Sequence, residues 1–219
     1  IASGGNYNVV VGDEAGTAIT TGDRNVAIGF SALATEDTAT HNTAVGTYTL
    51  YTQNAGDVAA YNTAVGHSAG YAITTGIQNV LVGGLAGDAL TDADHNIALG
   101  TNALGSDTKG SRSVAIGHGT LYTQNFTTDT NSFNVAVGYQ AGTAVTTGLQ
   151  NTIVGAAAGD ALVDADMNVA VGYLALSTDT YGSKSVAIGK EALATQNFTT
   201  ATDTFNTAVG HNAGSSVTT

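Results

Sequence analysis

The side chains that could do chemistry are few in this chain, and their spacing matches no catalytic or metal-binding motif that we recognise. The 219 residues include no cysteine, which excludes disulfides and cysteine-ligated zinc. Lys190 follows Gly189 as in a phosphate-binding loop, but Glu191 stands where that motif needs Ser or Thr. Zinc-protease and EF-hand motifs are absent as well. The sequence therefore predicts no enzyme, no catalytic residue, no metal site and no cofactor.

Two acidic turns and five histidines are the remaining candidates for metal chemistry. Closely spaced carboxylates could hold Ca²⁺, but their spacing fits neither the EF-hand nor the glycine-rich calcium repeat. We interpret them as solvated turns, and the histidines as surface side chains. The residues are Asp88, Asp92, Asp94, Asp160, Asp164 and Asp166, and His41, His67, His95, His118 and His211.

Recognition is more plausible than catalysis, and two insertions are the candidate ligand-binding loops. They combine aromatic rings, amides and a carboxylate, a mixture that suits sugar binding, and loops on a rigid scaffold commonly carry binding residues. The alternative is that the two Phe rings only pack over the body of the protein. The candidate residues are Tyr122, Asn125, Phe126 and Asp129 in one insertion, and Asn197 and Phe198 in the next.

Composition excludes several classes of protein. There are 17 acidic and 5 basic residues, a formal net charge of −12, so a nucleic-acid partner is not expected. Apolar residues make up 42% of the chain, yet no apolar run approaches the ~18 residues of a membrane helix, so no membrane insertion is expected. Only 6% of residues are aromatic, while 29 are glycine. The fold must therefore bury small side chains efficiently.

An internal repeat supplies the elements that position these residues. A pentad, Asn/Ser followed by an aliphatic residue or Thr, a mostly small residue, an aliphatic residue and Gly, occurs twelve times, and we number coils 1–12 from it. Successive pentads mostly start 17 residues apart. The pattern of coils repeats with a super-period of 72 residues, and coils 3, 7 and 11 are longer than the others. We expect one solenoid over residues 1–219, a segment of a longer fibre. The pentads start at residues 8, 25, 42, 62, 79, 96, 113, 134, 151, 168, 185 and 206.

Each pentad is typical of a strand that is buried on both faces. Its second and fourth residues share one face and its third points to the other, and both faces are apolar. The third residue is Ala in nine coils, with Val10, Leu81 and Ile153 as the exceptions. We predict parallel stacked coils, a column of hydrogen-bonded Asn side chains, and a rod of roughly 55–60 Å. We further predict a parallel homotrimer in which the Ala side chains, such as Ala136, face the axis or an adjoining chain.

Four segments, two for each of two families, carry a resemblance to known proteins. Ser113–Gly117 and Ser185–Gly189, both Ser-Val-Ala-Ile-Gly, resemble the head repeat of YadA-type trimeric autotransporter adhesins. Asn134–Gly142 and Asn168–Leu176 are more similar to repeat shafts of bacteriophage tail fibres. The resemblance implies a left-handed β-roll with three chains packed through their inner strands. Two departures are the 17-residue coil, longer than the adhesin repeat, and the lack of a chaperone domain.

These observations lead to a structural prediction for the function. We expect a shaft segment of a homotrimeric fibre for host attachment, located in a virion tail fibre or otherwise extracellular. The alternative is a trimeric adhesin on a bacterial cell surface, whose rod binds glycans or matrix. An ice- or metal-binding solenoid fits less well, because Thr-Thr pairs such as Thr74-Thr75 recur only once per super-period.

Overall fold

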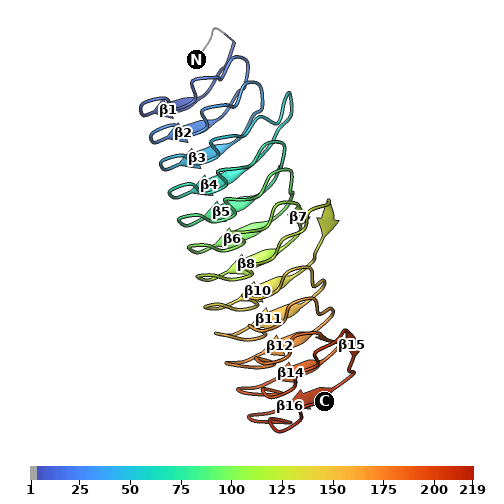
Figure 1. Cartoon of the computed structure of the whole chain (residues 1–219). Helices are drawn as coiled ribbons and strands as arrows, with labels where there is room; N and C mark the ends of the chain where they lie inside the picture. Colours follow the sequence, from blue (N-terminus) through green and yellow to red (C-terminus); the bar gives the residue numbers. More distant parts are fainter. Residues whose placement is uncertain (1–3) are drawn as a thin grey trace.

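The computed structural model describes residues 4–219, which form an all-β parallel solenoid of twelve coils (Figure 1). One three-residue strand from each coil joins a single parallel sheet whose strand order follows the chain. Neighbouring strands pair pentad to pentad, as Val9 with Val26 and Val135 with Thr152. The predicted solenoid and its coil period are thus confirmed.

The twelve strands of the sheet occupy the middle three residues of the pentads. They are β1 (Val9–Val11), β2 (Val26–Ile28), β3 (Thr43–Val45), β4 (Thr63–Val65), β5 (Val80–Val82), β6 (Ile97–Leu99), β8 (Val114–Ile116), β10 (Val135–Val137), β11 (Thr152–Val154), β12 (Val169–Val171), β14 (Val186–Ile188) and β16 (Thr207–Val209). Two short parallel pairs lie at another edge of the rod (Figure 1). They join β7 (Gly110–Ser111) to β9 (Thr130–Asn131) and β13 (Gly182–Ser183) to β15 (Thr202–Asp203).

The glycine that closes each pentad is required by close contact between coils. Gly29 has a φ of +132°, and a Cβ there would lie 2.5 Å from the carbonyl oxygen of Gly46 in the next coil. Gly46 meets Gly66 in the same way. A side chain would force the coils apart at this corner, so only glycine permits their 17-residue stacking.

The asparagine column exists, but its hydrogen bonds differ from the predicted amide ladder. Asn25 donates its backbone N–H to Oδ1 of Asn8 (2.8 Å), and its Nδ2 donates to the carbonyl of Ala39 (2.9 Å). Direct amide-to-amide bonds are exceptions, as from Asn79 to Asn62 (3.2 Å). Each buried Asn therefore ties the backbone of the next coil to its own coil.

The insertions explain why Ser replaces Asn in coils 7 and 11. The Nδ2 acceptor is the carbonyl fourteen residues on, and the insertions displace that carbonyl. Ser113 contacts Ser132 through their hydroxyls instead (2.5 Å). Coil 3 keeps Asn42, and its buried Nδ2 has no hydrogen-bond partner.

The prediction that the Ala side chains face a partner chain is wrong. Ala27, Ala136 and Ala187 are fully buried within the single chain, because the third pentad residue points into the coil. The second and fourth residues point outward instead and are half-buried or exposed. Both faces are apolar in sequence, so alternation alone could not distinguish the inner face from the outer one.

The core is filled by complementary columns of small and large side chains. The eighth residue after each pentad start is Gly or Leu. Where it is Leu, as at Leu104, the residue three positions later is polar (Asp107), and where it is Gly, as at Gly70, that residue is aliphatic (Ile73). A Cβ on Gly70 would lie 2.8 Å from Cδ1 of Leu81 and 3.1 Å from Cδ1 of Ile73. The large inward exception, Leu81, thus uses space left by glycine.

Candidate functional site

The long coils place the predicted recognition residues in two different environments. Tyr122 is 42% exposed at the turn after the sheet, and Asn125, Asp129 and Asn197 are also exposed in their loops. Phe126 is only 6% exposed, and its ring therefore offers no free face to a ligand.

Phe198, the equivalent of Phe126 in coil 11, is half-buried. The burial of Phe126 favours the non-binding interpretation for that ring, whereas Phe198 keeps part of its surface exposed.

A buried polar network holds each insertion in place. The Nε2 of Gln124 donates to Oδ2 of Asp107 (2.5 Å) and to Oγ of Ser113 (2.9 Å), while its Oε1 accepts from Nδ2 of Asn134 (2.9 Å). The other carboxylate oxygen of Asp107 accepts the N–H groups of Gly110 and Phe126 (3.0 and 3.1 Å). This network fixes the backbone at both ends of the loop, so its role is structural.

The same network recurs in the third super-period and is incomplete in the first. Gln196 bonds to Asp179, Ser185 and Asn206. In coil 3, Gln53 makes one such bond, accepting from Nδ2 of Asn62 (3.2 Å), and its Nε2 is buried without a partner.

Glu36 occupies the position of the network carboxylate in the first super-period. Burial raises the pKa of Glu36, a shift that the N–H group of Ala39 partly opposes. A buried carboxylate of this kind is a structural weak point, because burial disfavours its charged form.

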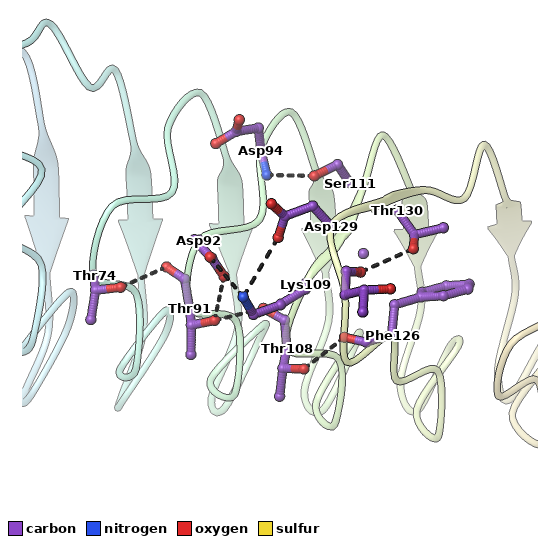
Figure 2. Close-up of polar contacts among 12 residues, drawn as sticks. Thr74, Thr91, Asp92, Asp94, Thr108, Lys109, Ser111, Phe126, Asp129 and Thr130 are labelled. Atoms are coloured by element: carbon purple, nitrogen blue, oxygen red, sulfur yellow. Dashed lines mark hydrogen bonds and ion pairs between the residues drawn. The ribbon is translucent and has the colours of Figure 1, made fainter.

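Lys109 links the insertion of coil 7 to coil 5 through two ion pairs, which we call the lysine clamp (Figure 2). Nζ of Lys109 lies 3.0 Å from Asp92 and 3.6 Å from Asp129. A hydrogen bond from Thr91, together with Lys109, holds the pKa of Asp92 below its usual range. Beside the clamp, hydroxyls of Thr91 and Thr108 donate to carbonyls in the next coil (3.0 and 2.8 Å). Asp129, a predicted recognition residue, thus takes part in an ion pair while its side chain remains 83% exposed.

Two carboxylates of the acidic turns accept backbone donors, whereas Oδ1 of Asp160 is buried without a hydrogen-bond partner. Asp94 accepts the N–H of Ile77 (2.8 Å), and its counterpart Asp166 accepts that of Leu149 (2.8 Å). Burial raises the pKa of Asp88 and Asp160. Within residues 4–219, no group of three or more His, Cys, Asp or Glu side chains is arranged to hold a metal ion.

The prediction that no catalytic motif is present overlooked one segment, because Gly66–Gly70 carries the Gly-x-Ser-x-Gly spacing of a nucleophile elbow. Such an elbow requires a strand, a sharp turn and a following helix, with an exposed Ser hydroxyl. Ser68 is 7% exposed, and the chain continues into the next coil with no helix anywhere in the described residues. The spacing here reflects the repeat and does not build a nucleophile.

A feature shaped like a ligand site lies at the turn that follows β8. A hollow of about 300 Å³ is lined by Asn102, His118, Gly119, Tyr122, Gln140 and Thr143. A Cβ on Gly105 would lie 3.1 Å from Cε2 of Tyr122, so the Tyr122 ring rests against glycine. The opposite ring, His118, stacks on Tyr139 at 5.5 Å with an interplanar angle of 14°.

Of the predicted recognition residues, only Tyr122 belongs to this hollow. Neither Asn125 nor Asp129 lines it, and coil 11 has no equivalent, since Ala194 replaces the tyrosine. The sequence did hold a signal for the missed residues. The sixth residue after each pentad start carries a side chain in every coil except coil 7, where it is Gly119.

No family model, curated protein or solved structure matches this chain. Residues 4–219 also contain no helix long and apolar enough to cross a membrane.

Proposed function

We propose that this segment is a structural shaft of a homotrimeric fibre for host attachment, most similar to the shaft of a phage tail fibre. The observation that carries the proposal is the outward face of the sheet. Its second and fourth pentad residues are Val, Ile, Leu or Thr in all twelve coils, without a charge. Eight of the aliphatic side chains among them are 36–66% exposed, namely Val9, Val11, Val65, Val80, Val82, Ile97, Ile188 and Val209.

The apolar stripe on this face is larger than isolated soluble chains usually expose. Eleven coil steps of about 4.8 Å give an uncharged stripe about 53 Å long. Monomers rarely expose contiguous apolar patches of more than a few hundred square ångströms, and extended ones mark interfaces. Parallel copies packed through this face would remove the stripe from water over the length of the rod.

Threefold rather than twofold packing, and a left-handed coil, follow from the resemblance to YadA-type repeats. The shaft function needs a stiff rod and no reaction, which fits the dense core. The segment then belongs in a virion tail fibre, outside the cell. A surface adhesin would share the trimer and differ by binding glycans or matrix along the rod.

Two neighbouring substitutions test the proposed interface. Val137→Glu places a charge on the outward face, so we expect the trimer to dissociate while far-UV circular dichroism still reports folded coils. Ala136→Glu places a charge in the coil interior, so we expect local unfolding. Light scattering of the parent protein should give three times the 21.7 kDa chain mass. A parent monomer, or a trimer indifferent to Val137→Glu, would refute the proposed packing.

Location can be tested separately. Gold-labelled antibodies against residues 4–219 should mark the tails of phage particles in electron micrographs of an infected culture. Labelling confined to bacterial envelopes would favour the adhesin instead.

A further inference from the structure

The hollow beside Gly119 is an interruption in a column of side chains. The residues of this column, six after each pentad start, adopt the left-handed conformation in every coil. Gly119 has a φ of +63°, and a Cβ built there would meet only Cγ of Gln140, at 3.6 Å. The space above this glycine is therefore free, whereas the neighbouring Asn102 and Gln140 fill the column on either side.

The first super-period shows what fits into this space. Tyr48 stands in coil 3 where Gly119 stands in coil 7, with a similar φ of +57°. Its ring packs edge-on against Phe30 at 5.3 Å and Tyr51 at 5.7 Å, and also against His67 and Tyr71, both at 6.4 Å between centroids. A six-membered ring thus fills the equivalent position within the protein itself.

In the second super-period two of the surrounding rings remain, but Gly119 replaces the Tyr48 ring. Tyr122 takes the place of Tyr51, and Tyr139 takes the place of His67. Both are exposed, at 42% and 56%, but Tyr139 already stacks on His118, so Tyr122 is the tyrosine ring that lines the hollow. The wall residues Asn102, Gln140 and Thr143 add two amides and a hydroxyl.

We propose that this hollow binds one neutral hexopyranose residue of a glycan. Tyr122 would receive the C–H face of the sugar ring, because an aromatic face packs well on apolar C–H groups. The amides of Asn102 and Gln140 stand two coils apart, about 10 Å, and can bond hydroxyls at opposite edges of the same ring. A purely aromatic ligand would leave these polar groups without partners.

Charge selects a neutral sugar over an acidic one. None of the six lining residues is an acid, a lysine or an arginine, and the chain carries a formal net charge of −12. A carboxylate or sulfate on the sugar would meet no counter-charge in the hollow and a repulsive field around it. The proposal is independent of the shaft function, since the hollow lies beyond the strands and not on their outward face.

The binding test uses the intact protein and four defined sugars. Methyl β-galactopyranoside, methyl α-glucopyranoside and N-acetylglucosamine are neutral probes, and glucuronic acid is the charged one. We expect saturation-transfer NMR to detect at least one neutral sugar with a dissociation constant on the order of 1–10 mM, typical for so few atoms. No transfer to any neutral sugar at 50 mM, or tighter binding of glucuronic acid, would overturn the proposal.

Three substitutions in the column of residues that contains Gly119 test where the sugar binds. Gly119→Tyr copies the first super-period and should abolish binding while the protein stays folded. Leu174→Tyr adds the same ring to the same column three coils away, and binding should not change. Tyr48→Gly should open a second hollow that lacks the two amides, because Ser31 and Ser68 stand where Asn102 and Gln140 do, so the number of sugars bound per chain should stay at one.

The outcomes separate site loss from misfolding. Unchanged binding by Gly119→Tyr, or lost binding by folded Leu174→Tyr, would place the sugar elsewhere and refute the assignment. If Gly119→Tyr does not fold, Tyr122→Thr removes the proposed stacking face and copies Thr143, its counterpart in the next coil. That variant should weaken binding at least tenfold, and unchanged affinity would equally refute the site.

Discussion

Truncating the glutamine of the buried network in different super-periods gives a sharp test of what holds the long coils together. Gln124→Ala and Gln53→Ala remove the same atoms from equivalent positions in coils 7 and 3. The cavity contributions should be similar, because both side chains are fully buried. The difference between the two variants therefore isolates the hydrogen bonds.

The magnitudes follow from the bonds that each side chain makes. Gln124 loses one bond to the carboxylate of Asp107 and two neutral bonds, to Ser113 and Asn134. At about 1.5–3 kcal/mol for a charge-assisted bond and about 1 kcal/mol for each neutral one, the loss is about 4 kcal/mol. Gln53 loses one bond of 3.2 Å and also removes an unpaired buried donor, so its network contribution is close to zero.

We therefore expect Gln124→Ala to lower the free energy of unfolding by about 3–4 kcal/mol more than Gln53→Ala. Urea unfolding at one fixed protein concentration gives this difference, and hydrogen exchange of the Gly110 and Phe126 amides should report it locally. Gln196→Ala serves as a replicate, because Gln196 makes the same three bonds. Equal destabilisation by Gln124→Ala and Gln53→Ala would refute the network as the stabilising element.

Three further predictions concern the first super-period and the coil period. Asn42→Ser combined with Ala60→Ser copies the Ser113–Ser132 pair and removes an unpaired buried donor, so it should stabilise by about 1–2 kcal/mol in thermal melts, whereas either single change should not. Burial raises the pKa of Glu36 above its ordinary 4.5, so the contribution of this group to stability is fully present below pH 4.5 and is lost as the pH rises through its pKa in the folded protein. The rise in melting temperature of Glu36→Gln over the parent should therefore be larger at pH 7 than at pH 4. An equal rise at both pH values would contradict this assignment. Deleting Asn79–His95 removes β5 and joins coil 4 to coil 6 in the way that coil 1 already joins coil 2, so the rod should stay folded and become about 4.8 Å shorter. Variants that lack 16 or 18 residues at this place should have far lower melting temperatures, because their strands lose register. Similar melting temperatures for all three variants would refute the coil assignment.

The sequence by itself determined the coil number, the strand positions and their pairing. Those features follow from spacing, because parallel strands of a solenoid must repeat at the coil period and each pentad supplies one β-branched strand. The sequence also shows a Gly at the end of every pentad, and the close approach of Gly29 to Gly46 gives the physical reason for it. The two insertions were recognisable as loops from the spacing as well.

The tertiary structure alone decided which face of the strand is the core. Both faces are apolar in sequence. In the structure, Leu and Ile side chains from the opposite walls leave room for a methyl group such as that of Ala136, and larger residues fit where glycines lie beside them, as at Leu81 and Ile153. It also decided that Phe126 is buried while Tyr122 borders a hollow, although the two lie four residues apart in one loop segment. That hollow is made by three successive coils around one missing side chain, and a spacing pattern along the chain does not show which side chains meet across coils.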